Sequence, residues 1–557
     1  MKENININSN YDNNYSNREI NQNNKSNNSF HNNQNSVNKC SNNNLKKYNS
    51  INSINQYINI TLDNIGFTKY HFLLFITNAF FLFCEGMNEI IHIILLSMIN
   101  EKHKLSHYHL AFMNSIEYLG YSISALSVSS ITNIINRKNA ILISVFISLL
   151  CTGVSITKFN FFFASFNRLI LGFCFGILDL LIYLNLFESL PSKIRGFVST
   201  MILLFFPLGE FTLSLICYFK LKEGEIELNY KFMLLFPFIF NCIICLTAMF
   251  VQESPRELFF GKQQYEKGAE SFRKISEFNK DNDSKNKFNF GEPDIDNKLK
   301  KIEIELRNIS PINEINNNNI NIENNEINNN INNDKENNIG KGLLKGDTES
   351  NMFKISKFNQ LFNNIYRKYT ILFWVLASFA GFVFNGVHFM LPATAPKINK
   401  NIFLDLVLFE SMEIPPNFFA MLLIENKDIG RKRTIRIGFF ITFLVSLINI
   451  YLGESILLFD CILKFSITIP SNVLIVYCSE IYDSHVRTLG LSLMNFWKKI
   501  ISLFSPFFMS YIIYKYGEFS THLCYTPLLI ICSLGSLFLT IETRGKILDT
   551  IIGVTYK

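Results

Sequence analysis

The sequence predicts an all-α membrane protein in which twelve transmembrane helices form two pseudo-symmetric bundles of six. Its long apolar runs are the first observation, because a run of about 20 apolar residues satisfies its own backbone hydrogen bonds as a helix in lipid. The second is their order, with six runs, a long hydrophilic stretch and six more runs. The third is a pair of charged strings, QESPR from Gln252 and ETRGK from Glu542, that follow the sixth and twelfth runs. Such repetition indicates two related halves.

The twelve spans follow from the lengths of the apolar runs. In the first half they are 71–99, 107–132, 138–157, 159–186, 197–218 and 230–251. In the second half they are 370–392, 401–424, 435–451, 455–478, 488–514 and 523–541. The polar tail before the first span is longer than 60 residues, so no cleavable signal peptide is expected.

Two Asn-rich segments, 1–66 and 277–350, contain few residues that could pack in a core. We expect both to be disordered, because they cannot bury enough surface to offset the entropy lost on ordering. The predicted organisation is a disordered cytosolic tail (1–66), a first six-helix bundle (67–251), a cytosolic linker with a short amphipathic helix and the disordered insert (252–369), a second six-helix bundle (370–541) and a cytosolic tail (542–557).

Lys and Arg concentrate in the loops on one side of the predicted membrane. Arg137, Arg195, Arg431 and Arg487 follow spans two, four, eight and ten. Positive loops face the cytosol, so both termini and the linker are predicted to be cytosolic. The plasma membrane is the expected location, with a vesicle or vacuole membrane as the alternative. These loops also account for the net charge of +7, so no nucleic-acid partner is inferred.

The composition argues against other classes of protein and site. Hydrophobic residues make up 48% of the chain and charged residues only 17%, averages that blend the apolar runs with the Asn-rich segments. The twelve long apolar runs, rather than these averages, effectively exclude a soluble enzyme. The eleven cysteines fall mostly inside apolar spans, where thiols act as small hydrophobic groups. Neither a metal site nor a cofactor is expected, and no arrangement of nucleophile and base is evident. We expect a monomer in the lipid bilayer.

Acidic residues inside the spans are the first candidates for function, because a charge there costs about 2.5–3.5 kcal/mol on insertion. They are Glu85, Glu89, Glu117, Asp179 and Glu210. Glu85 and Glu89 are four residues apart and therefore share one helix face. Crowded carboxylates in a low-dielectric site take up a proton near neutral pH, as proton coupling requires. The alternative is a place near the headgroups or a structural ion pair.

Basic residues inside the spans are rarer. Arg168 and Lys464 precede Glu188 and Glu480 by about 16 to 20 residues, which fits the internal repeat. Lys498 and Lys499 lie deep in span eleven, so one of them is expected to face a cavity, where it would bind an anionic substrate or a carboxylate. His388 in span seven is a candidate proton relay or substrate ligand, or a structural histidine.

Several loop motifs together resemble the major facilitator superfamily, in the sugar-porter-like branch that includes synaptic-vesicle-protein-related and organic-ion transporters. The motifs are SITNIINRK, FESLPSKIRG, QESPR, ENKDIGRKR, SEIYDSHVRTLG and ETRGK. The resemblance covers nearly all of the chain outside the Asn-rich inserts. It implies the major facilitator fold and a set of gate or conformational residues: Arg137, Arg168, Glu188, Arg195, Glu253, Arg256, Gly430, Arg431, Glu480, Arg487 and Glu542.

The first loop motif departs from the family pattern. Asn133 stands where the family has Asp, and Asn136 stands where it has Gly. The resemblance assigns this loop a charge-paired latch, so the missing carboxylate is expected to weaken the latch in the first half.

The resemblance also bears on the substrate. Lys464 stands where relatives carry an Arg in span ten, and Lys499 stands where organic-anion-like relatives carry a basic residue. The prediction is a proton-coupled, secondary active transporter of a small organic anion, such as a pantothenate- or nicotinate-like vitamin or a metabolite, working by alternating access. Its predicted substrate-binding or coupling residues are Glu85, Glu89, Asp179, Glu210, His388, Lys464 and Lys499.

Three alternatives stay open. An organic cation or drug would fit the acidic first half, and a sugar fits less well because the chain has only two Trp. The third is a non-transporting protein of the same fold that acts in vesicle trafficking or sensing. Costly buried charges argue against this last alternative, because a scaffold has no need of them.

Overall fold

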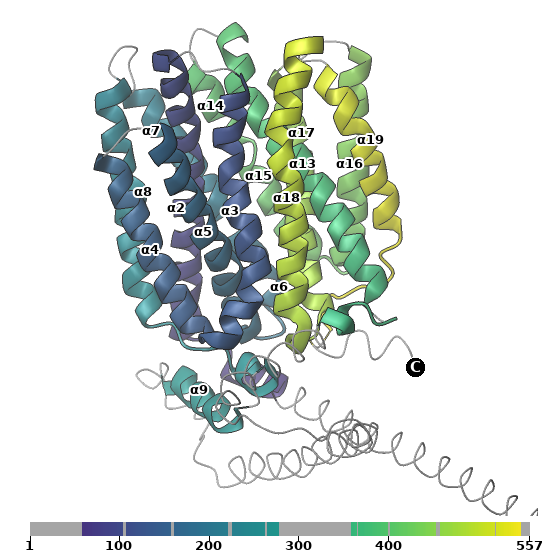
Figure 1. Ribbon diagram of the computed structural model, residues 1–557. Helices are drawn as coiled ribbons and strands as arrows, with labels where there is room; N and C mark the ends of the chain where they lie inside the picture. Colours follow the sequence, from purple (N-terminus) through teal and green to yellow (C-terminus); the bar gives the residue numbers. More distant parts are fainter. Residues whose placement is uncertain are drawn as a thin grey trace, which may run out of the picture. The chain divides into compact units, whose positions relative to one another are not determined.

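The computed structural model describes the chain between residues 58 and 548 with several gaps (Figure 1). The described residues are 58–103, 107–157, 161–220, 226–261, 264–277, 358–364, 366–398, 402–452, 457–517, 520–546 and 548. They belong to one compact unit. Of the two segments predicted to be disordered, 1–57 and 278–350 lie outside them.

The described residues form helices and no strand, as the sequence predicts. Up to residue 277 these are α2 (Lys69–His103), α3 (His107–Ile134), α4 (Arg137–Thr157), α5 (Phe161–Ser189), α6 (Arg195–Ile202), α7 (Phe205–Lys220), α8 (Ile226–Met249), the π-helix η1 (Glu257–Gly261) and α9 (Tyr265–Glu277). After it come α13 (Arg367–Ile398), α14 (Ile402–Ser411), α15 (Ile414–Glu425), α16 (Gly430–Leu452), α17 (Leu457–Ile481), α18 (Ser484–Tyr516) and α19 (Ser520–Leu537).

Two of the predicted continuous spans are broken helices. The fifth span, 197–218, is divided between α6 and α7 by a turn at residues 203–204. The eighth span, 401–424, is divided between α14 and α15, and Pro415 and Pro416 stand at the start of α15. Proline fits the first turn of a helix because the N–H it lacks would have no partner there.

Ten stretches of helix in the described part are long and apolar enough to cross a membrane. The predicted spans 107–132 and 488–514 are not among them, although they are helical as α3 and α18. Serines crowd α3, and Arg487, Lys498 and Lys499 lie in α18. The count of twelve spans and the division into two bundles therefore stay predictions.

Helical structure begins earlier than predicted. Residues 58–65 are helical, although they fall in the segment predicted to be disordered. Ile58 and Leu62 are fully buried, and the side chain of Asn59 accepts a hydrogen bond from Arg256 at 2.5 Å. These contacts provide the packing that the rest of the Asn-rich composition lacks.

Helices from both sides of the linker pack against one another. In Figure 1, α3 and α18 run side by side, and contacts also join α7 to α14 and α6 to α15. Ser115 of α3 donates a hydrogen bond to the carbonyl of Leu503 on α18 at 2.8 Å. Several of the side chains described below lie on these three helix pairs.

Close contact between α3 and α5 depends on glycine. A Cβ atom at Gly172 would collide with the carbonyl oxygen of Glu117, and one at Gly120 would collide with that of Leu169. The two backbones could not approach so closely with larger residues at these positions.

Gly172→Ala is expected to destabilise the protein by about 1–3 kcal/mol, because the added methyl group overpacks a rigid backbone contact. Thermal unfolding of the purified protein in detergent measures the change. Gly535→Ala is the matched control, since a Cβ there meets only leucine methyl groups at 3.4 and 3.5 Å. Equal melting temperatures for the two variants would contradict the prediction.

Candidate functional site

A small buried pocket lies where α3, α5 and α18 meet. It is lined by Tyr121, Ala125, Gly176, Asp179, Leu180, Ser492, Asn495 and Lys499. The centre of a water-sized sphere can occupy only about 10 Å³ of it, which is room for about one water molecule. We call Glu85, Tyr121, Asp179 and Lys499 the central site. In this conformation it is closed around its own side chains.

Tyr121 connects the charged members of the central site. Its hydroxyl donates a short hydrogen bond to Oε1 of Glu85 on α2. The ammonium of Lys499 lies 3.8 Å from the centre of the Tyr121 ring and 5.5 Å from that of Tyr118. The ring face of tyrosine attracts a cation, so these rings hold Lys499 in place.

Lys499 has no carboxylate within 4.0 Å among the described residues. The buried cations Arg168, Lys464 and Arg487 each have one. Lys498, its neighbour on α18, does not line the pocket, and its Cγ lies beside Gly381 of α13. Of the two lysines, Lys499 is the one that faces the pocket.

Glu89 and Arg168 lie next to the central site. Tyr118 donates a hydrogen bond to Glu89 at 3.4 Å and to Asn385 of α13 at 2.7 Å. Arg168 forms an ion pair with Glu117 at 2.9 Å and donates to the carbonyl oxygen of Asn88 at 3.0 Å. Arg168, predicted as a gate residue, therefore has its polar contacts beside the central site.

A second charged group, which we call the α7–α14 cluster, comprises Glu210, His388, Glu410, Glu413 and Lys464. Lys464 is 1% exposed and makes a close ion pair with Glu410. Its Nζ lies 3.1 Å from Glu413 and 4.0 Å from Glu210. Nε2 of His388 lies 3.7 Å from both Glu210 and Glu410. Glu210, His388 and Lys464, predicted from separate spans, thus meet in one place.

Glu188 is the centre of a third network, at the predicted cytosolic end of the helices. One of its carboxylate oxygens lies 2.9 Å from Arg137 of α4, and the other lies 3.3 Å from Arg487 of α18. Arg137 also contacts Glu257 at 2.7 Å and the hydroxyl of Thr488 at 2.6 Å. Arg137, Glu188 and Arg487 are all buried, and their ion pairs join α4 and α5 to α18.

Arg137, in the first loop motif, has its ion-pair partners outside that loop. Asn133 cannot provide the carboxylate of the family pattern, but Arg137 has Glu188 and Glu257 as ion-pair partners. Arg137 thus pairs with carboxylates from α5 and η1 instead of one from its own loop.

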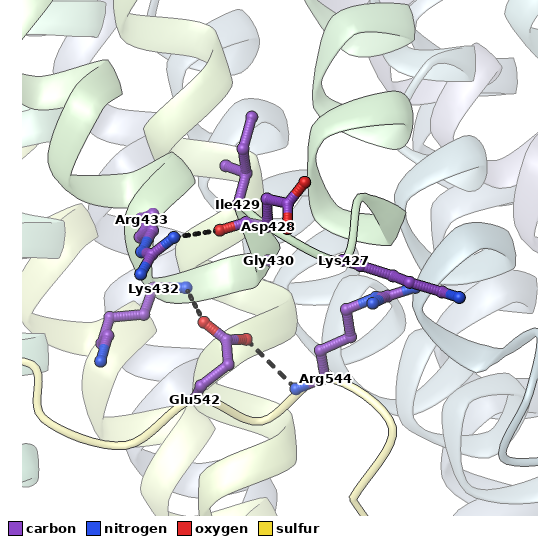
Figure 2. A pocket seen from close by; sticks show the side chains of 8 residues that line it. All are labelled: Lys427, Asp428, Ile429, Gly430, Lys432, Arg433, Glu542 and Arg544. Carbon is purple, nitrogen blue, oxygen red and sulfur yellow. Dashed lines mark hydrogen bonds between the residues drawn. The ribbon is translucent and has the colours of Figure 1, made fainter.

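Arg431, Glu480 and Glu542 form the corresponding network in the second half. Arg431 lies 3.3 Å from Glu480, and one oxygen of Glu542 accepts the backbone N–H of Arg431 at 3.0 Å. The other oxygen of Glu542 accepts the backbone N–H of Lys432 at 3.0 Å (Figure 2). Glu542 thus caps the N-terminus of α16, where a negative charge is favourable. Gly430 has a positive φ of 65°, and a Cβ on it would lie 2.7 Å from the Glu542 carboxyl carbon.

Three further predicted gate residues surround these networks. Arg256 donates to the carbonyl of Glu188 at 3.1 Å, and Arg195 donates to that of Leu190 at 3.0 Å. The carbonyl oxygen of Glu253 accepts a hydrogen bond from Ser271 of α9 at 3.0 Å. Arg195 and Arg487 also lie over the same ring, Phe187, each at 5.6 Å.

Several residues of these sites were not predicted as site residues from the sequence. Glu410 and Glu413 are acidic residues in an apolar run, so the rule that selected Glu85 would also have selected them. Tyr118, Tyr121, Asn385 and Glu257 carry no such signal, because an uncharged polar group in a span or an acidic residue in a loop is ordinary.

Comparisons with known proteins agree with this architecture. A family model for the Major Facilitator Superfamily matches residues 79–506. A relative named SVOPL from Danio rerio is 32% identical over 127 residues, which are 22% of this chain and 24% of the relative. Solute carrier family 22 member 21 from Mus musculus is 26% identical over 127 residues, 22% of each chain. The matched segments thus span about a quarter of these relatives.

A solved structure is similar over nearly its whole length. The proton:xylose symporter XylE from E. coli aligns with a TM-score of 0.65 and 14% identity, over 88% of this chain and 99% of that chain. At this identity the likeness shows the fold. The family match and the shared fold point to a transporter rather than an enzyme, and confirm the resemblance drawn from the motifs. The chain is a multi-pass membrane protein that belongs to the Major Facilitator Superfamily.

Proposed function

We propose that the protein is a secondary active transporter that carries a small organic anion together with a proton by alternating access. The observation that carries this proposal is Lys499, a half-buried cation that lines the central pocket and has no carboxylate within 4.0 Å among the described residues. Two tyrosine rings hold it in position. An ammonium group so placed would bind the carboxylate of a substrate without first breaking an ion pair.

The proton would be carried by Glu85 and Asp179. The charged groups that act electrostatically on Glu85 are Asp179 of α5, Lys499 of α18 and Glu117 of α3. Tyr121 donates a hydrogen bond to Glu85. Glu210 lies on α7, which also packs on α2. Two carboxylates near one ammonium favour binding of a proton when the anion neutralises Lys499.

The family membership and the names of the relatives support the transport of a small solute. XylE, named as a proton:xylose symporter, supports proton coupling and keeps a sugar as the competing cargo. The positive loops support cytosolic termini, and we propose that a monomer works in the plasma membrane.

Uptake of labelled organic anions, cations and sugars into proteoliposomes at two external pH values tests the proposal. We expect accumulation of a small carboxylate that increases as the external pH falls. Accumulation of a cation or a sugar alone would contradict the anion assignment. If purified, membrane-inserted protein moves no solute, the non-transporting alternative is favoured.

Glu85→Gln is expected to remove the pH dependence of uptake while leaving anion binding in place. The amide keeps an acceptor for Tyr121 but cannot take up or release a proton. Uptake at the two pH values should then become equal, and accumulation against a gradient should be lost. Glu270→Gln on the exposed face of α9 is the matched control. A pH dependence that survives in Glu85→Gln would exclude Glu85 as the coupling group.

A further inference from the structure

The α7–α14 cluster brings together more negative charge than the described side chains neutralise. One potential ligand atom from each of Glu210, His388, Glu410 and Glu413 lies within 4.8 Å of the others, and all four residues are buried. Three carboxylates carry three negative charges, whereas Lys464 supplies one positive charge. A net charge of about two units in a low-dielectric interior requires a further counter-charge.

Several polar atoms of the cluster have no hydrogen-bond partner in the described part of the chain. They are both carboxylate oxygens of Glu210, Nε2 of His388 and Oε1 of Glu410. Glu210 is 0% exposed and His388 is 7% exposed, so bulk water does not reach them freely. Buried polar groups without partners are costly, and several of them pointing at one another indicate a missing partner.

The separations between these atoms fit a shared ion better than a hydrogen bond. Nε2 of His388 lies 3.7 Å from Oε1 of Glu210 and 3.7 Å from Oε2 of Glu410. Hydrogen bonds are shorter, at about 2.7–3.2 Å. Ligands that lie about 2.1 Å from one Zn²⁺ ion at tetrahedral angles are about 3.4 Å apart, close to the spacing found here.

We propose that Glu210, His388 and Glu410 bind a divalent transition-metal ion of the zinc type, with Glu413 and Lys464 beside it. One imidazole nitrogen with carboxylate oxygens is a ligand set that such an ion accepts. Its two positive charges would balance the remaining charge of the cluster. Because Glu210 lies on α7, His388 on α13 and Glu410 on α14, the ion would tie together helices from both sides of the linker.

The break between α14 and α15 helps to form this site. Glu410 lies in the last turn of α14, and Glu413 is the residue before the first turn of α15. In a straight helix, residues three apart would lie on neighbouring turns of one face. Here the chain turns at residues 412–413, and both carboxylates contact Lys464.

Metal binding to the purified full-length protein tests the proposal independently of transport. Isothermal titration with Zn²⁺ is expected to show one ion per chain. His388→Ala and Glu210→Gln should each weaken binding by roughly tenfold or more. His522→Ala is the matched control, because His522 is a buried histidine that contacts Asp460 at 3.3 Å and lies outside the cluster.

Co²⁺ in place of Zn²⁺ provides a second readout that needs no variant. A tetrahedral site with a nitrogen ligand should give intense visible absorption, and this absorption should disappear when Zn²⁺ is added. A wild-type protein that gives no such absorption and binds less than one Zn²⁺ per chain would overturn the proposal and leave protons as the counter-charge. Equal affinity in wild type and His388→Ala would overturn it too.

Discussion

Lys499→Ala is expected to abolish uptake of the organic anion at any pH. A charged partner removed from a buried ion pair costs about 2–5 kcal/mol of binding, which corresponds to roughly a 30-fold or greater loss of affinity. No other cation lines the central pocket, among the residues described, that could replace Lys499. Uptake and direct binding of the labelled anion measure the effect.

Two further substitutions make this result specific. Lys499→Arg keeps the charge and its contact with the tyrosine rings, so part of the uptake should remain. Lys498→Ala removes the neighbouring lysine, which does not line the pocket, and should retain anion binding. Wild-type affinity in Lys499→Ala would show that the anion binds elsewhere or that the cargo is not an anion.

Glu188→Gln should open the predicted cytosolic end of the protein. The amide leaves Arg137 and Arg487 buried without their shared carboxylate, and breaking a buried ion pair in this way costs about 3–5 kcal/mol. A loss of this size at a contact between α5 and α18 shifts a two-state equilibrium by roughly 100-fold or more toward the state in which they separate.

The rate at which a thiol reagent labels a cysteine at position 479 reports this opening. Ser479 is fully buried and lies 3.3 Å from the hydroxyl of Tyr183 on α5, so Ser479→Cys should react slowly in the closed protein. Addition of Glu188→Gln should speed the reaction at least about tenfold. Glu270→Gln serves as the control because its ion pair with Lys274 is exposed. An unchanged rate would mean that Glu188 does not hold this end closed.

Much of the fold could be predicted because a membrane imposes simple rules on a sequence. Each long apolar run became helical, since lipid offers no other partner for the backbone. The break at residues 203–204 lies in apolar sequence, so nothing local marks its turn. The break at residues 412–413 was missed although Pro415 and Pro416, which fit the first turn of a helix, follow it directly. The start of helix at residue 58 depends on Arg256, far away in the sequence.

Sequence reasoning identified charged residues but could not pair them. Glu117 and Arg168 are 51 residues apart, and Lys464 and Glu410 are 54 residues apart, so only the packing of helices brings each pair together. The proposed repeat relates Arg168 to Lys464 by position in the sequence, yet Arg168 lies beside the central site and Lys464 lies in the α7–α14 cluster. The tyrosines that contact Glu85 and Lys499 carry no charge, so the search for charged residues in the spans did not identify them.

The cap that Glu542 places on α16 has a mechanical consequence. Glu542 follows α19, so its two hydrogen bonds fasten the segment after α19 to the first turn of α16. Arg436 adds hydrogen bonds to carbonyl oxygens at the end of α19, and Ser446 contacts Thr526 at 2.6 Å farther along both helices. Because they are attached at these successive levels, α16 and α19 are expected to move together as one rigid unit in a conformational change. Bending would then concentrate in the helices that they push against.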